Sequence, residues 1–187
     1  MKKKLIFGFD ISTTKIGIAI LNEKEEILQS ESLIYPQENL SLEEKAERFF
    51  NRLMIMIKLI SDKLFVESDI VLIVEEPAKS FMKGKSNPQT IAMLQRFNGM
   101  CCFGLYHSFK VIPKLVNPRT VRKTLGIKVP KELTQKKKKM FIIDWVVEKM
   151  GMMFDKNGGG KNYVDGADDE AEAVLCALSE IRKNEKG

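Results

Sequence analysis

Residues 4–21 read KLIFGFDISTTKIGIAIL and set the architecture of the N-terminal part of the chain. Two apolar runs, 4–10 and 16–21, flank a Ser-Thr-Thr turn, which predicts two strands joined by a tight connection. A polar turn follows at 22–25, and partial alternation of apolar and polar residues over 27–34 predicts a third strand. The chain therefore begins with an antiparallel meander whose first strand ends on an acid, Asp10.

The remaining 150 or so residues alternate between helical and strand patterns. Ser41 and Glu44 form a capping box before apolar residues at helical spacing. A continuous apolar run at 70–74 predicts a buried strand that ends on Glu75. We further expect a helix over 89–106, a fifth strand beginning at 111–112, a short helix that starts at Asn117-Pro118, a helix from Thr134 and a last helix over about 165–183. This order predicts a single α/β domain over residues 1–187, with a mixed five-stranded sheet flanked by helices.

Charge and composition narrow the classes of partner. The 187 residues carry a net charge of +6 and a sequence pI of about 9.1, and residues 110–139 hold eleven Lys or Arg against one acid. This favours nucleic acid as the partner, ahead of an anionic membrane surface. The sequence has no apolar run of about 18 residues, so we expect no membrane span.

Cysteine and histidine usage excludes other kinds of site. The three cysteines lack metal-ligand spacing, which predicts reduced thiols and a cytoplasmic location. The single histidine, His107, argues against a histidine-rich zinc site and against a Ser-His-Asp hydrolase.

Acids are placed where a divalent cation could bind. Asp10 and Glu75 each follow an apolar strand, and they meet at one sheet edge if those strands are parallel neighbours. Taken alone, each acid is more often a turn former, a strand end or a helix-dipole partner. The last helix adds acids at i, i+3, i+4 and i+7, which share one face beside its apolar face: Asp165, Asp168, Asp169 and Glu172. Carboxylate oxygens are ligands that Mg²⁺ prefers. Two such ions can activate a water and stabilise the leaving oxygen in phosphodiester hydrolysis, and no histidine is required.

These motifs resemble those of RuvC-type DNA junction resolvases. Gly8-Phe9-Asp10-Ile11-Ser12 with Gly17-Ile18-Ala19 resembles the opening motif of that family, and Ile73-Val74-Glu75 resembles its second acidic motif. Residues 81–83 resemble the loop that follows, and residues 116–126 with the helix after them are similar in layout. Residues 169–173 resemble the closing motif of the family, although Glu172 stands where the family usually has Asp. The order and spacing of the motifs, more than any one of them, carry the resemblance.

The resemblance implies a ribonuclease-H-like fold, a homodimer and paired nicks in a four-way (Holliday) DNA junction. It implies a catalytic and metal-binding set of Asp10, Glu75, Asp169 and Glu172, with Asp168 as a close rival to Asp169 and Glu76 as a weaker alternative to Glu75. The implied cofactor is Mg²⁺, or Mn²⁺ in its place, with two ions per active site. The helix over 89–106 is apolar on several sides, which is expected either of a dimer element or of a deeply buried helix. The sequence does not specify a helicase partner.

Basic residues provide the expected DNA contacts. Those beside the second acidic motif are Lys79, Lys83 and Lys85, and the resemblance suggests that Phe81 wedges against a base. The others are Arg119, Arg122, Lys123 and the run Lys136, Lys137, Lys138 and Lys139, which we expect to contact phosphates and not bases. A lysine run such as 136–139 is otherwise an ordinary solvated start of a helix.

Three other functions remain open from the sequence. A related nuclease would cut other branched or hybrid nucleic acid, because the acids dictate hydrolysis and not substrate shape. A non-catalytic nucleic-acid-binding protein of the same fold would keep the basic residues but need not retain both strand-end acids. Residues 9–14 also resemble the phosphate-binding hairpin of actin-like kinases, but those enzymes generally use two such domains and this chain supplies one.

Overall fold

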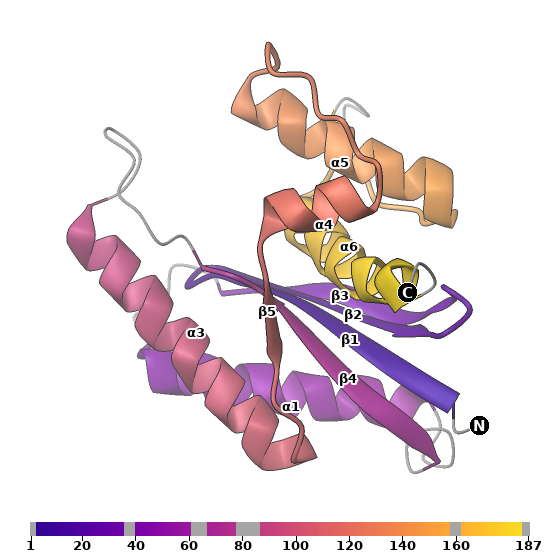
Figure 1. Ribbon diagram of the computed structural model, residues 1–187. Helices are drawn as coiled ribbons and strands as arrows, with labels where there is room; N and C mark the ends of the chain where they lie inside the picture. Colours follow the sequence, from indigo (N-terminus) through magenta and orange to yellow (C-terminus); the bar gives the residue numbers. More distant parts are fainter. Residues whose placement is uncertain (1–2, 36–39, 61–66, 78–86, 158–161, 185–187) are drawn as a thin grey trace.

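The computed structural model describes residues 3–35, 40–60, 67–77, 87–157 and 162–184. It contains the expected mixed sheet of five strands, in the order β3-β2-β1-β4-β5 (Figure 1). The strands are β1 (Lys3–Ile11), β2 (Lys15–Asn22), β3 (Ile27–Ile34), β4 (Ser68–Glu75) and β5 (Lys114–Val116). The helices are α1 (Leu42–Ile60), α3 (Pro88–Phe109), α4 (Pro118–Thr124), α5 (Gln135–Met150) and α6 (Ala167–Asn184).

The predicted meander is confirmed. β1 pairs antiparallel with β2, with Asp10 opposite Gly17, and β2 pairs antiparallel with β3. The β1–β2 turn is closed by Ser12, whose backbone N–H donates to the Lys15 carbonyl and whose hydroxyl oxygen accepts from the Lys15 N–H. The next turn places Glu25 in the left-handed region, at φ 65°, and the Asn22 side chain accepts from the N–H groups of residues 24 and 26.

β4 runs parallel to β1 in the centre of the sheet, with Val74 opposite Phe9. A parallel neighbour requires a crossover connection, which is why α1 lies between β3 and β4 in the chain. The carboxyl ends of β1 and β4 therefore meet at one edge of the sheet, as expected from their sequences.

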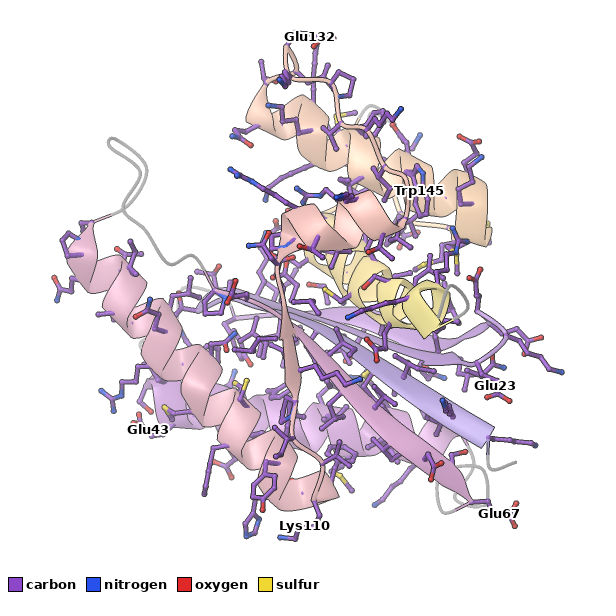
Figure 2. The ribbon with its side chains drawn as sticks, viewed as in Figure 1. Glu23, Glu43, Glu67, Lys110, Glu132 and Trp145 are labelled. Atoms are coloured by element: carbon purple, nitrogen blue, oxygen red, sulfur yellow. The ribbon has the colours of Figure 1, made fainter. Side chains whose placement is uncertain are left out.

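The fifth strand begins later than predicted. Residues 111–112 are not part of it, because α3 continues to Phe109 and ends at Lys110, which adopts a left-handed conformation (φ 56°) and donates its N–H to the Tyr106 carbonyl. Lys110 is labelled in Figure 2, at the end of this helix. The chain needs the following residues to reverse direction, so pairing with β4 starts at Lys114.

Side-chain polarity explains most helix starts. Ser41 and Glu44 exchange the two hydrogen bonds of a capping box before α1. Asn87 and Asn117 cap α3 and α4, each followed by a proline, and Thr134 caps α5. α6 begins at Ala167, two residues later than predicted. Asp165 therefore lies in the turn before the helix, and the prediction that it belongs to the helix was wrong.

Helices cover both faces of the sheet (Figure 1). α1 and α3 lie on one face, where Phe7, Phe9, Phe49 and Phe97 are fully buried. α6 lies on the other face, and α4 and α5 pack over it, so the stretch 173–180 is buried throughout. Because side chains alternate along a strand, Phe7 and Phe9 point to the first core while Gly8 and Asp10 point toward α6.

Two glycines let α6 lie directly against the sheet. A Cβ atom built on Gly8 would come within 2.0 Å of the Ala173 carbonyl oxygen, and one on Gly17 within 1.9 Å of the Asp169 carbonyl oxygen. Helix backbone therefore occupies the space that strand side chains would otherwise fill. This close approach fixes the height of α6 above the strand ends.

In the part of the chain that the structure describes, no helix combines the length and apolar character needed to cross a bilayer.

We expect Gly8→Ala to lower the free energy of unfolding by about 1–3 kcal/mol or more, because its methyl group would meet helix backbone that cannot rotate away. Gly99→Ala on α3 is the control. Its methyl group would have no neighbour within 4 Å, so helix propensity should raise stability by roughly 0.5–1 kcal/mol. Urea unfolding followed by circular dichroism measures both changes. Equal midpoints for the two variants would contradict the packing account.

Candidate active site

The strand-end acids lie side by side, as predicted. Asp10 is the penultimate residue of β1 and Glu75 is the last residue of β4, and their preceding residues, Phe9 and Val74, are direct partners in the parallel ladder. Ile73 faces the α6 core, so Glu75, two residues further on, faces the same side. Both carboxylates therefore leave the sheet toward α6.

α6 brings three more acids to this edge. The Asp169 carbonyl lies against Gly17, and Gly17 is the pairing partner of Asp10. Asp168 and Asp169 occupy the first turn of the helix and Glu172 the next. The group formed by Asp10, Glu75, Asp168, Asp169 and Glu172 is referred to below as the acidic cluster.

Burial and mutual repulsion raise the pKa values of Asp10, Glu75, Asp169 and Glu172. Desolvation is the largest cause for Asp10, followed by the charges of Glu75, Asp169, Glu172 and Asp168, and the pKa of Asp10 lies well above its usual range. Desolvation and the neighbouring Glu172 raise the pKa of Glu75 to about 8, and desolvation followed by Asp168 raises the pKa of Asp169 to about 6. Burial also raises the pKa of Glu172.

The sequence left open whether Asp169 or Asp168 joins Glu172 in the site, and the structure distinguishes these two acids. Asp169 acts on Asp10 more strongly than Glu172 or Asp168 does, and Asp168 has the weakest influence of the cluster. Asp169 and Glu172 each have a buried carboxylate oxygen without a hydrogen-bond partner, Oδ2 and Oε2, among the described residues. Asp169 and Glu172 thus lie closest to the strand-end acids in electrostatic terms.

Three basic residues face the cluster. Arg122 on α4 donates from Nη2 to Glu172 Oε1, and Lys139 on α5 donates from Nζ to Asp168 Oδ2. Lys15, at the start of β2, donates to Asp165 and lies 3.8 Å from Asp169 Oδ2. Sequence reasoning named Arg122 only as a DNA contact and did not name Lys15. The position of Lys15 beside the β1–β2 turn was a usable signal, because a hairpin returns the chain to the edge that carries Asp10.

The donor set fits a hard divalent cation in its chemistry. Carboxylate oxygens are the ligands that Mg²⁺ and Mn²⁺ prefer, and three buried oxygens (Glu75 Oε2, Asp169 Oδ2 and Glu172 Oε2) lack hydrogen-bond partners within the described ranges. Yet no three Asp, Glu, His or Cys side chains among these residues are arranged to hold a metal ion. Glu172 and Asp168 instead turn toward Arg122 and Lys139, so cation binding requires their side chains to move.

The predicted DNA contacts fall into two groups. Lys79, Phe81, Lys83 and Lys85 lie outside the described residues. Arg119, Arg122 and Lys123 lie on α4, where Arg119 and Lys123 are exposed, and Lys136 and Lys137 are exposed in the first turn of α5.

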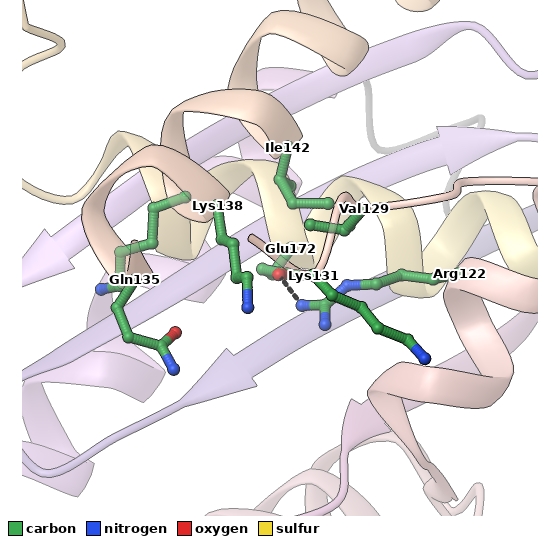
Figure 3. A pocket seen from close by; sticks show the side chains of 8 residues that line it. Arg122, Val129, Lys131, Gln135, Lys138, Ile142 and Glu172 are labelled. Carbon is green, nitrogen blue, oxygen red and sulfur yellow. Dashed lines mark hydrogen bonds and ion pairs between the residues drawn. The ribbon is translucent and has the colours of Figure 1, made fainter. Parts of the chain in front are cut away.

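A basic pocket of about 330 Å³ borders the acidic cluster between α4 and α5. Its charged and polar lining residues are Arg122, Lys131, Gln135, Lys138, Lys139 and Glu172. Figure 3 shows Lys138 extending toward the Arg122–Glu172 ion pair, and Lys131 lying beside Arg122. Lys131 was not among the predicted contacts, and the exposed Lys137 does not line this pocket.

The raised pKa of Glu75 predicts how stability depends on pH in EDTA. Between its ordinary value of 4.5 and about 8, the folded state holds a proton that the unfolded state has lost, so the free energy of unfolding falls as pH rises through this window. We expect Glu75→Gln to be more stable than the wild type at pH 8, by roughly 1–3 kcal/mol, and nearly equal to it at pH 4.5.

Thermal unfolding at both pH values measures this difference. Glu132→Gln is the control, because Glu132 is exposed in the connection between α4 and α5, away from the sheet (Figure 2). If both variants track the wild type at both pH values, Glu75 carries no buried charge penalty.

Comparison with known proteins identifies the fold. No protein-family model matches the chain, and no curated protein sequence matches it. Among solved structures, RuvC of T. thermophilus in complex with a Holliday junction substrate is similar, with a TM-score of 0.62 and 14% identity over 98% of this chain and 96% of that chain.

Two other solved structures are similar over almost the whole chain. The yeast mitochondrial Holliday junction resolvase Ydc2 has a TM-score of 0.52 and 14% identity, with 96% of this chain and 78% of that chain covered. The fowlpox virus resolvase, solved with Holliday junction DNA, has a TM-score of 0.50 and 17% identity, with 96% and 98% covered. At these identities the likeness establishes the fold, and the chain has the ribonuclease-H-like fold of the RuvC-type resolvases.

Proposed function

We propose that this protein is a divalent-metal-dependent endonuclease that resolves four-way DNA junctions by paired phosphodiester hydrolysis. The observation that carries the proposal is the acidic cluster. Two acids from adjacent strand ends and three from a helix are gathered at one edge, and three of their buried oxygens have no hydrogen-bond partner among the described residues. Four buried carboxyls with raised pKa values, gathered beside a fifth acid, are expected of a cation-binding site.

The acids divide into a rigid pair and an adjustable pair. Asp10 and Glu75 are held by the central ladder of the sheet, and Asp169 and Glu172 come from α6; these four would hold Mg²⁺ or Mn²⁺, two ions per site, with Asp168 at the margin. When bound, such ions supply an activated water and charge stabilisation at the leaving oxygen. Arg122 and Lys139 stand beside the cluster, where they can neutralise charge on a bound phosphate.

Basic residues outside the cluster would position the DNA. Arg119, Lys123, Lys136 and Lys137 are exposed on the two helices that cover α6, and contacts from such residues go to phosphates. Lys79, Phe81, Lys83 and Lys85 remain proposed contacts on the strength of their position after Glu75 in the sequence. The fold neighbours solved with Holliday junctions support branched DNA as the substrate class.

Cleavage of a labelled four-way junction tests the proposal. We expect Mg²⁺-dependent, paired nicks that disappear in EDTA, and a loss of rate of at least about a hundredfold in Asp10→Asn, since that residue is at the centre of the cluster. Asp69→Asn is the matched control, because Asp69 is an exposed acid at the opposite end of β4 from Glu75.

The other outcomes distinguish the competing functions. Equal cutting of a linear duplex or a hybrid would indicate a related nuclease without junction specificity. Junction binding without cutting in any divalent metal would indicate a non-catalytic DNA-binding protein. That second function is favoured by one observation, the ion pairs that already occupy Glu172 and Asp168.

We also propose that the protein is a homodimer, because two nicks related by symmetry call for two active sites. α3 and the segment after it expose large apolar side chains: Phe103 (68%), Tyr106 (46%), Ile112 (76%) and Leu115 (52%). Phe103 and Tyr106 are three residues apart and share a face of the helix. This apolar surface is the proposed dimer interface.

Analytical ultracentrifugation of charge variants tests the dimer. We expect the wild type to sediment as a dimer and Phe103→Asp as a monomer, because a carboxylate in an apolar interface loses its hydration without gaining a partner. Met153→Asp is the control, since Met153 is 95% exposed and lies outside α3. A monomeric wild type would exclude the proposed interface.

A further inference from the structure

The basic residues that pair with the acidic cluster also line a second possible binding site. Arg122 and Lys139 each hold an ion pair with a cluster acid, and both also line the basic pocket between α4 and α5. Their side chains are 31% and 62% exposed, whereas the carboxylates they contact are 16% and 18% exposed. The basic side chains are thus more accessible to solvent than the carboxylates they contact, and so to a ligand that arrives from solution.

The ion pairs do not compensate the cluster fully. Asp10 and Glu75 form no ion pair with any described residue, and Asp169 and Glu172 each keep one buried oxygen without a hydrogen-bond partner there. Arg122 also has a buried Nε without a partner in the same set of residues. Neither side of the Arg122–Glu172 pair is therefore saturated, and each has a bonding group left for another ligand.

Lys139 acts on four of the five acids in the cluster. Its charge bears on Asp168, Asp169 and Asp10, and it is one of the groups that lower the pKa of Glu172. A positive charge in this position opposes a divalent cation electrostatically and occupies one of the carboxylates that the cation would use. A divalent metal cation and the Lys139 ammonium group therefore compete for the same acids.

The basic pocket is suited to an anionic ligand. Four basic side chains line it, against one acid, Glu172, and that acid is already paired with Arg122. The basic residues are Arg122, Lys131, Lys138 and Lys139. The first turn of α5 contributes to the lining through Gln135, so the positive end of the helix dipole adds to the field. Figure 3 shows the charged ends of Arg122 and Lys138 near Glu172, with the Lys131 side chain beside Arg122. A phosphate group is the ligand whose charge and oxygen acceptors match such a pocket.

We propose that Arg122 and Lys139 are exchangeable counter-ions, which neutralise Glu172 and Asp168 when no divalent cation is bound and move to a nucleic-acid phosphate in the basic pocket when one is. The exchange deepens the proposed function and rests on it for the identity of the phosphate. Its consequence is a positive coupling: a divalent cation frees phosphate-binding groups, and a bound phosphate withdraws competitors from the acids. By linkage, each ligand strengthens the other by the same factor.

The first test titrates Mn²⁺ into the DNA-free protein and measures its affinity calorimetrically. Lys139→Met and Arg122→Met remove the competing cations, so we expect Mn²⁺ to bind about fivefold tighter or more, at the lower end of ordinary coupling. Lys138→Met is the matched control: Lys138 lines the same pocket on the same helix turn but has no acidic partner among the described residues. We expect its Mn²⁺ affinity to stay within about twofold of wild type.

The second test measures junction DNA binding by fluorescence anisotropy in EDTA and in Ca²⁺, a hard cation with the same preference for oxygen ligands, with a gel to verify that the DNA stays intact. We expect Ca²⁺ to tighten binding by the wild type and by Lys138→Met about fivefold or more, and to have little effect on the Arg122→Met/Lys139→Met double variant. Urea unfolding verifies that each variant is folded; Lys139, the more exposed of the two, provides the single variant least able to disturb the fold.

The outcomes separate this inference from the proposed function. Tighter Mn²⁺ binding in Lys138→Met equal to that in Lys139→Met would reduce the effect to general electrostatics and overturn the exchange. Junction cleavage with unchanged Mn²⁺ affinity in all variants would overturn the exchange and leave the nuclease intact. Selective tightening in Lys139→Met and Arg122→Met without any junction cleavage would support the exchange at the acids and reject the nuclease.

Discussion

The backbone contact between α6 and two strand glycines is the constraint on which the rest of the structure depends. Gly8 and Gly17 leave room for the Ala173 and Asp169 carbonyl groups, so the helix lies lower on the sheet than side chains would allow. At this height the first turns of α6 reach the carboxyl ends of β1 and β4. A helix held one side-chain layer higher would carry the same acids but leave them apart from Asp10 and Glu75.

The same contact explains the layers above. A helix pressed against the sheet on one side and apolar on the other requires a cover, and α4 and α5 provide it through Val121, Ile142, Ile143 and Val146. These two helices also carry the cations that face the acids. The packing that buries α6 therefore places Arg122 and Lys139 beside the cluster, so one arrangement serves both stability and the site.

The electrostatics of the site oppose the stability of the fold. Burial and repulsion raise the pKa values of Asp10, Glu75, Asp169 and Glu172, so ionised carboxylates at neutral pH cost folding free energy. Lys15, Arg122 and Lys139 offset part of that cost through ion pairs. A fold alone does not specify an activity. An acidic site that the protein compensates only in part is a more specific indication of cation chemistry than the likeness to known resolvases.

Local patterns in the sequence determined the meander, the capped helices, the buried central strand and the strand-end acids, because each depends on neighbours within a few residues. The same reasoning missed the late start of β5 and the position of Asp165, since helix ends depend on the residue that adopts a left-handed or turn conformation. Only the tertiary structure decided which cations meet which acids. Arg122 and Glu172 are 50 residues apart in the chain, and Lys139 and Asp168 are 29 apart. Such contacts depend on how whole helices pack, and no spacing within one element encodes them.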